Sequence, residues 1–264
     1  MYHFFVEQEQ IGQKEIVITG EDVNHIRNVL RMKPGEEVLI SNGQGINYCC
    51  EVTEIAKEKV IAQILSENEE QRELPAKLYL FQGLPKGEKM ELIIQKAVEL
   101  GVYQIIPVST RRSVVKLEGK KEEAKIRRWN SIAESAAKQS GRGIIPKVTG
   151  VMSLKEAFSY AKEFDRRIIP FEHAKGMFKT KRELEQIKPK MEVGIFIGPE
   201  GGFEDEEITL AQEAGVAPIS LGKRILRTET AGLMVLSVTG YLLELQEETS
   251  HRNGRNESGY GSIF

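Results

Sequence analysis

The sequence predicts a small β-rich domain followed by an α/β domain that is built on a parallel sheet. Three observations support this prediction. Before residue 66, short stretches of alternating apolar and polar residues are separated by turn signals. A polar segment that ends in Pro75 then interrupts the pattern. Beyond it, apolar strands alternate with amphipathic helices, which is the order typical of parallel sheets covered on both faces.

The first domain carries a clear β-hairpin signal. Asn42 and Gly43 separate two predicted strands, and both residue types tolerate the positive φ angles of a tight turn. A short helix is expected at residues 20–30, where Glu21 and Asp22 would stand at its positive N-terminal end. The strands of this domain are predicted at residues 15–19, 38–41, 46–54 and 60–65.

Residues 66–75 are polar and end in proline, so we expect a linker there. This places the two domains at residues 1–72 and 73–247. Residues 248–264 are polar and contain glycine, and we expect them to form a disordered tail.

The second domain shows no internal repeat, and its elements follow one another in an alternating order. Gly101 stands where the C-cap of its first helix would require glycine. Strands are predicted at residues 77–82, 105–108, 167–171, 192–197 and 219–221, and helices at residues 86–100, 122–139, 154–164, 205–214 and 230–245.

Composition narrows the class of protein. Apolar residues make up 40% of the 264 residues and charged residues 29%, which is ordinary for a globular protein. No apolar run is long enough to cross a bilayer and the N-terminus does not resemble a signal peptide, so we expect a cytoplasmic protein. Cys49 and Cys50 are adjacent and the four histidines are scattered, so we expect no metal site.

The formal net charge of −2 does not indicate a nucleic-acid binder, but basic residues are clustered. Such local patches can bind phosphate even when the total charge is balanced. The alternative is that they are solvated faces, which we favour for residues 120–128 because Glu122 and Glu123 lie among the lysines. The other clusters are Arg27 with Arg31, Arg111 with Arg112, Arg166 with Arg167, and residues 175–190.

A first glycine-rich loop, IGPEGG at residues 197–202, follows an apolar strand and precedes an acidic helix start. Ligands of α/β sheets bind at the carboxyl ends of strands, and glycines allow close approach of the backbone. Neither a P-loop nor a dinucleotide fingerprint is present. Because Glu200 and the acidic residues after the loop would repel phosphate, a cationic ligand such as the sulfonium of S-adenosylmethionine fits better. The alternative is a tight turn without a ligand.

A second loop, LGKRILRTETA at residues 221–231, also lies between a predicted strand and a predicted helix. Thr228 or Glu229 can cap that helix. Capping leaves the polar set of Arg224, Arg227 and Glu229 unexplained, and a polar set at this edge of a sheet indicates recognition or catalysis.

Together the two loops resemble the paired signature of the RsmE-type 16S ribosomal RNA uridine-N3 methyltransferases, in the SPOUT superfamily. Three further segments, residues 25–35, 86–101 and 139–146, resemble other motifs of this family. Five motifs in the same order make the resemblance specific, and it covers nearly the whole chain. Lys138 departs from the pattern, since many members carry glutamate there, and we assign it no catalytic role.

The resemblance implies a C-terminal SPOUT-type domain with a deep trefoil knot, a PUA-like β-barrel that grips RNA, and a homodimer. It also implies methylation of N3 of a uridine in 16S ribosomal RNA of the small ribosomal subunit, with S-adenosylmethionine as cofactor and without a metal. The cofactor would be held by Ile197, Gly198, Pro199, Glu200, Gly201, Gly202, Leu221, Gly222, Ile225, Leu226, Arg227 and Ala231.

In such an enzyme, Arg227 is the candidate for stabilising negative charge on the uracil oxygens. Glu229 is the first candidate for the base and Glu200 the second, although either could instead face the sulfonium or cap a helix. Candidates for RNA binding are Arg27, Arg31, Lys86, Arg111, Arg112 and Arg142.

The main alternative function is a non-catalytic RNA-binding or ribosome-assembly factor that retains this fold. A Rossmann-type methyltransferase is disfavoured because its glycine-rich turn would follow the first strand. A hydrolase is disfavoured because the sequence contains no G-x-S-x-G motif.

Overall fold

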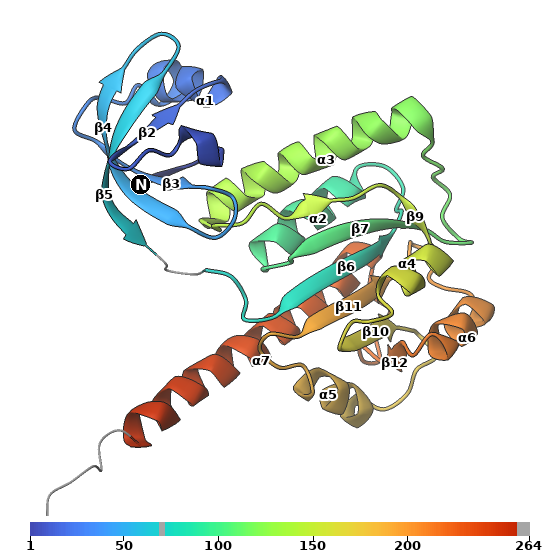
Figure 1. The fold of residues 1–264 in the computed structure, drawn as a ribbon. Helices are drawn as coiled ribbons and strands as arrows, with labels where there is room; N and C mark the ends of the chain where they lie inside the picture. The colour runs from blue at the N-terminus through green and yellow to red at the C-terminus, as the bar shows by residue number, and fades with distance from the viewer. Residues whose placement is uncertain (69–71, 258–264) are drawn as a thin grey trace, which may run out of the picture. The chain divides into compact units, whose positions relative to one another are not determined.

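The computed structural model describes residues 1–68 and 72–257, with side chains up to residue 249 (Figure 1). The described chain divides into two compact units. The first comprises Met1–Glu73 together with Glu134–Ile145, and the second comprises the remaining described residues. The segment at residues 134–145 lies within the predicted second domain, but it packs with the first unit.

The first unit is built on a five-stranded mixed sheet in the order β1-β3-β4-β5-β2. β1 pairs with β3 in parallel, and the other pairs are antiparallel. The apolar residues that alternate along these strands form the core, in which Ile16, Val38 and Ile40 are fully buried or nearly so. The strands are β1 (Tyr2–Phe5), β2 (Glu15–Ile18), β3 (Glu37–Ser41), β4 (Asn47–Ile55) and β5 (Val60–Asn68), and a short 3-10 helix, η1, covers Gln8–Gln10.

The predicted hairpin at Asn42 and Gly43 is confirmed. The side-chain oxygen of Asn42 accepts hydrogen bonds from the amides of Gln44 (2.9 Å) and Ile46 (3.1 Å), and Gly43 has a φ of 70°. These contacts close the connection between β3 and β4, which pair in antiparallel.

The predicted helix at residues 20–30 is only partly regular. α1 (Glu21–Asn24) continues into η2 (His25–Leu30), which is wound as a π-helix. Arg31 then takes a left-handed conformation with a φ of 54° and ends the helix. Because the backbone changes pitch and then leaves the helix, Arg27 and Arg31 are not spaced as one turn of a regular α-helix.

The end of the long helix α3 (Gly119–Ser140) and the segment after it belong to the first unit. Lys138 lies 3.2 Å from Asp22 and 3.0 Å from Glu134. Lys138 therefore binds α3 to α1, which gives this departure from the family pattern a structural role.

The second unit contains a seven-stranded sheet in the order β12-β10-β11-β6-β7-β8, with β9 also paired to β7. Every strand pair in it is parallel. The α/β class predicted from the alternating pattern is confirmed. The strands are β6 (Lys77–Gly83), β7 (Gln104–Ser109), β8 (Lys147–Val148), β9 (Met152–Ser153), β10 (Arg166–Pro170), β11 (Glu192–Ile197) and β12 (Ala217–Ile219).

Helices cover both faces of this sheet (Figure 1). α4 and α6 pack on one face, where the rings of Phe81 and Phe196 stack at 4.3 Å between centroids. On the other face α7 packs against β6 and β11, and α2 packs against α7. Apart from α3, the helices are α2 (Lys89–Glu99), α4 (Leu154–Tyr160), α5 (Met177–Glu185), α6 (Asp205–Glu213) and α7 (Thr228–Glu257).

Several elements differ from expectation. β1, α5, β8 and β9 were not predicted, because each is short or, in α5, polar along most of its length. β5 runs to Asn68, into the predicted linker, of which residues 69–71 lie outside the described residues. α7 continues to Glu257, since glutamate and glutamine after Leu245 sustain a helix, so residues 248–257 of the predicted tail extend this helix. Residues 258–264 of the predicted tail lie outside the described residues.

Candidate active site

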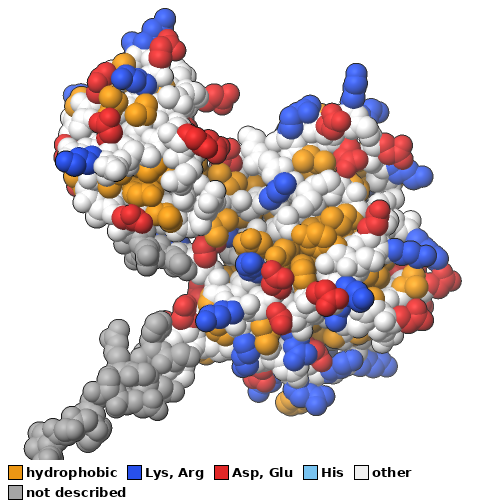
Figure 2. All heavy atoms as spheres, viewed as in Figure 1, with side chains coloured by type: hydrophobic (Ala, Val, Ile, Leu, Met, Phe, Trp, Pro, Cys, Tyr) orange, Lys and Arg blue, Asp and Glu red, His pale blue; other side chains and the backbone are white. Residues whose placement is uncertain are grey.

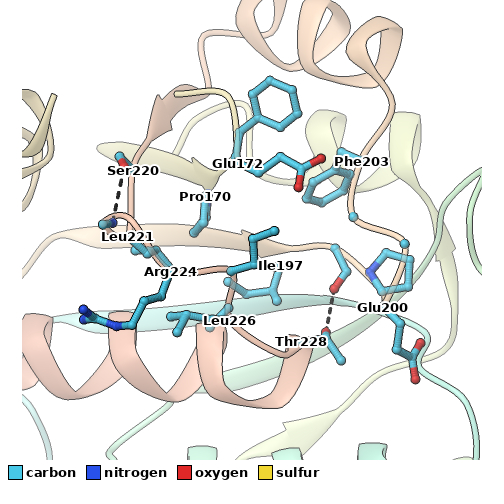
Figure 3. Close-up of a pocket in the computed structure, with 18 of the residues that line it drawn as sticks. Pro170, Glu172, Ile197, Glu200, Phe203, Ser220, Leu221, Arg224, Leu226 and Thr228 are labelled. Atoms are coloured by element: carbon cyan, nitrogen blue, oxygen red, sulfur yellow. Dashed lines mark hydrogen bonds between the residues drawn. The ribbon is translucent and has the colours of Figure 1, made fainter. Parts of the chain in front are cut away.

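A cleft opens at the carboxyl ends of β10, β11 and β12, with a cavity volume of about 200 Å³. Parallel sheets bind ligands at this edge. Figure 3 shows side chains from three loops around the cleft. The lining residues are 170–172, 197–203, 220–226, 228 and 231.

Nearly all of the residues predicted to hold the cofactor line this cleft. Arg227 is the exception, because its side chain is exposed and does not line the cleft. The end of β10 at Pro170 and the following loop residues Phe171 and Glu172 also line the cleft, and none of them was predicted to do so. The signal was available, since the strand predicted there ends at this edge of the sheet. Phe203, Ser220, Lys223, Arg224 and Thr228 were also absent from the predicted set.

The loop after β11 folds back tightly on itself. A Cβ atom at Gly198 would meet the backbone of Gly202 at 3.0 Å, and Gly202 has a φ of 67°. The amide of Gly202 donates a 2.9 Å hydrogen bond to the carbonyl of Pro199. Glycine is therefore required at both positions for the backbone to line the cleft.

Thr228 joins the two glycine-rich loops. Its hydroxyl donates a 2.6 Å hydrogen bond to the carbonyl of Gly198 and accepts one of 2.9 Å from Nε2 of Gln82 at the end of β6. α7 begins at Thr228 itself, so the predicted role of this side chain as the cap of a helix from Thr230 onward is replaced by a bond between loops.

Glu200 lies on the cleft rim, but its carboxylate points away from the cavity (Figure 3). It accepts hydrogen bonds from Nζ of Lys89 (2.7 Å) and from the amide of Lys86 (3.1 Å). Partial burial would raise the pKa of Glu200, but these hydrogen bonds and the charge of Lys89 outweigh it and lower that pKa. A carboxylate held in this way is a weak proton acceptor.

Glu229 is in a different environment. Its Oε2 atom is buried and has no hydrogen-bond partner within the described part of the chain. Glu229 follows Thr228 directly, so it stands beside the cleft although it does not line it. Its carboxylate is therefore the less engaged of the two candidate bases.

Three of the six candidates for RNA binding belong to each unit. Some are exposed, and others already bind acidic side chains or backbone carbonyls. Arg27, Arg31 and Lys86 are exposed. Arg111 pairs with Glu204 at 3.0 Å and also with Glu206. Arg112 donates a 2.6 Å hydrogen bond to the carbonyl of Gly201, so it supports the loop after β11.

Arg142 is buried, with its side chain only 3% exposed. Its Nε donates to both carboxylate oxygens of Glu73, at 3.2 and 3.0 Å, and its NH2 group also bonds to this carboxylate. A phosphate can reach Arg142 only if this buried ion pair breaks. The predicted RNA contact at Arg142 is therefore replaced by a structural role.

No group of three or more His, Cys, Asp or Glu side chains among the described residues has an arrangement that could hold a metal ion. Within the same residues, none of the helices combines the length and apolar character of a membrane span.

Comparison with known proteins decides the family. The family model described as RNA methyltransferase domain matches residues 72–240, and the model described as RNA methyltransferase PUA domain matches residues 18–65. Ribosomal RNA small subunit methyltransferase E of Bacillus subtilis is 39% identical over 251 residues, covering 93% of this chain and 98% of the relative. The chain belongs to the ribosomal RNA small subunit methyltransferase E family.

Solved structures agree with this assignment. The family member from Neisseria gonorrhoeae, solved bound to S-adenosyl methionine, has a TM-score of 0.81 and 31% identity, covering 92% of this chain and 98% of its own. A methyltransferase of Legionella pneumophila, in complex with the same cofactor, has a TM-score of 0.79 and 35% identity, covering 90% and 96%. The predicted ribosomal RNA small subunit methyltransferase E family, the α/β class and the PUA domain are confirmed.

Proposed function

We propose that this protein uses S-adenosylmethionine to methylate N3 of a uridine in 16S ribosomal RNA of the small ribosomal subunit. The observation that carries the proposal is the cleft in which IGPEGG and the loop before α7 come together. Two relatives of the same fold were solved with this cofactor bound. Action on ribosomal RNA places the protein in the cytoplasm.

The residues of the cleft fit this cofactor. Ile197, Leu226 and Phe203 provide apolar surroundings for a flat ring, and the glycine-rich backbone offers amides and carbonyls within reach. Glu172 lines the cleft and supplies negative charge for a cationic ligand. α6, whose first turn holds Asp205, Glu206 and Glu207, is unsuited to a phosphate. When bound, the cofactor supplies an electrophilic methyl group.

The protein must orient the uridine and accept its N3 proton. Holding two reactants in line can contribute roughly 7–11 kcal/mol in favourable cases. Arg227 is exposed beside the cleft, where a fixed guanidinium can stabilise negative charge on the uracil oxygens. Glu229 is the better candidate for the base, because Lys89 and the Lys86 amide already occupy Glu200.

We further propose the SPOUT-type trefoil knot and the PUA-like barrel for the two units. Support for the knot comes from β11, which lies between β10 and β6, and from Thr228, whose bond to Gly198 brings the chain after β12 back to the loop after β11. Support for the barrel comes from the five-stranded sheet of the first unit and its single buried core.

A homodimer is also part of the proposal. Val238, Tyr241 and Leu245 lie three and four residues apart on α7 and are 36%, 65% and 46% exposed. This spacing forms one apolar stripe along the helix. A second copy of the chain would bury the stripe in a two-fold interface. Light scattering should give twice the chain mass, and Tyr241→Glu should give the monomer mass.

The experiment that tests the function is analysis of ribosomal RNA nucleosides by mass spectrometry. A strain that lacks the gene should lose 3-methyluridine from 16S ribosomal RNA and regain it when the gene is restored. A protein that binds the cofactor by calorimetry but leaves this nucleoside unchanged would be an assembly factor or would methylate another position. Absence of cofactor binding by calorimetry would exclude the proposed enzymatic function.

A further inference from the structure

Two strongly exposed apolar side chains lie beside the candidate active site. Ile225 is 86% exposed and Phe178 is 84% exposed, the two largest fractions for large apolar side chains among the described residues. Scattered apolar residues on a surface are ordinary. These two differ because both belong to segments that border the same cleft.

Hydrogen bonds of Thr180 tie the first turn of α5, which carries Phe178, to a loop that lines the cleft. Phe178 lies in the first turn of α5, two residues before the buried Thr180. The Thr180 hydroxyl donates to the carbonyl of Ser220 (2.9 Å) and accepts from its amide (3.0 Å). Ser220 lines the cleft, as does Ile225 in the following loop. The start of α5 is therefore held by the same loop that carries Ile225.

The segment that carries Phe178 is rich in basic residues, although it also contains Glu172, Glu183 and Glu185. Figure 2 shows Lys and Arg side chains gathered over the region where Figure 1 places α5. Lys181 pairs with Glu185 at 3.6 Å, whereas Lys175 and Lys179 have no ion pair within the part of the chain that the structure describes. The cations of this segment are Lys175, Lys179, Lys181, Arg182, Lys188 and Lys190.

We propose that the start of α5 binds a single-stranded segment of RNA next to the methylated uridine, with Phe178 stacking on a base and Lys175 and Lys179 contacting phosphates. This inference rests on the proposed function and deepens it. Single-stranded nucleic acid is bound by aromatic side chains that stack on bases within a positively charged groove. A protein interface would instead need a contiguous apolar core. On α5, Phe178 has only Met177 as an exposed large apolar neighbour, and Lys179 and Lys181 lie on the same helix.

The first test measures binding of small ribosomal subunits from the deletion strain. Loss of one stacked base weakens binding about fivefold to 150-fold. Phe178→Ala should raise both Kd and KM for the subunits within that range and leave kcat at saturating RNA unchanged. Phe178→Trp should restore both values, and Phe178→Leu should not, because leucine keeps apolar bulk without an aromatic face. Cofactor affinity by calorimetry should stay unchanged in all three.

The second test measures the salt dependence of the same binding. Each lost phosphate contact should reduce the slope of log Kd against log salt by about 0.7 for a single strand. Lys175→Gln and Lys179→Gln should each have this effect. Lys162→Gln is the matched control, since Lys162 is 78% exposed and lies just before β10, at the opposite edge of the sheet. It should leave the slope unchanged.

The outcomes separate this surface from the proposed function. A wild-type Kd in Phe178→Ala, or wild-type salt slopes in the lysine variants, would overturn the proposal that the start of α5 binds RNA. A changed oligomer mass in Phe178→Ala with unchanged RNA affinity would show a protein interface and would overturn it too. If the unaltered protein binds subunits but never methylates them, the proposed function fails. The binding data would still test whether the start of α5 binds RNA.

Discussion

The hydroxyl of Thr228 donates a 2.6 Å hydrogen bond to the carbonyl of Gly198, and this bond joins the start of α7 to the loop after β11. Gln82 donates to the same hydroxyl from the end of β6. Thr228 is 5% exposed and Gln82 is fully buried, so water cannot replace either partner. The Thr228 hydroxyl therefore links the two glycine-rich loops and the end of β6 at one buried point.

Replacing Thr228 should loosen both loops. Thr228→Val keeps the shape of the side chain and leaves the Gly198 carbonyl without its donor, which should cost about 1–3 kcal/mol in the free energy of unfolding. Cofactor affinity should fall about tenfold, equivalent to about 1.4 kcal/mol. Urea unfolding and calorimetry measure the two effects.

Thr228→Ser should retain both properties, because serine keeps the hydroxyl. Thr209→Val is the matched control, since the exposed Thr209 donates only to the Asp205 carbonyl within α6. It should change stability by no more than about 0.5 kcal/mol. Unchanged cofactor affinity in Thr228→Val would show that the bond does not shape the cleft.

Removal of Arg227 should affect turnover and spare cofactor binding. Loss of one fixed donor to developing negative charge typically costs about 10²–10³-fold in kcat. Arg227→Ala should show this loss in single-turnover methylation, with the Kd of the cofactor unchanged. Arg127→Ala is the control, because Arg127 is 73% exposed on α3. Near-normal turnover in Arg227→Ala would exclude the proposed role.

The two glutamates should respond differently to amidation. Glu229→Gln should lower kcat by about 10²–10⁴-fold, the usual contribution of general base catalysis. Glu200→Gln should have a much smaller effect, because Lys89 already holds its carboxylate. Rates at saturating cofactor and RNA measure both. The reverse order would make Glu200 the base.

Glu200 should also contribute to stability in a way that depends on pH. Its pKa in the folded protein lies below the ordinary value of 4.5, so the unfolded chain binds the proton more readily. The contribution is then complete above pH 4.5 and is lost as the pH falls through the folded pKa. Glu200→Gln should cost about 1 kcal/mol near pH 7 and progressively less in acid, measured by urea unfolding across that range. A difference that is constant across this range would contradict the assignment.

Replacement of Arg142 should reduce folding stability, because its side chain forms a buried ion pair. Removing one member of a buried ion pair usually costs about 3–5 kcal/mol, because the other charge stays buried. Arg142→Met should lower the melting temperature strongly, whereas the exposed Arg27→Met should change it little. Normal stability together with weak RNA binding in Arg142→Met would instead indicate that Arg142 contacts RNA directly.

The sequence was sufficient to predict both glycine-rich loops of the cleft. Each follows an apolar strand, and in a parallel sheet such loops meet at one edge. The loop at Phe171 and Glu172 obeys the same rule, but its single glycine, Gly176, forms no glycine-rich motif. The direction of the Glu200 side chain was not predictable, because Lys89 and the Lys86 amide approach it from more than a hundred residues away in sequence.

The sequence by itself determined the family, the alternation of strands and helices, and the two loops that line the cleft. These properties depend on the period of apolar residues and on glycines at fixed spacings. Both are visible within short stretches of consecutive residues, whatever the packing of the chain. Only the tertiary structure decided that Arg142 pairs with Glu73, that Thr228 bonds to Gly198, and that Thr180 of α5 bonds to Ser220 in a cleft loop. The reason is that burial and hydrogen-bond partners depend on which distant segments the packed sheet brings together.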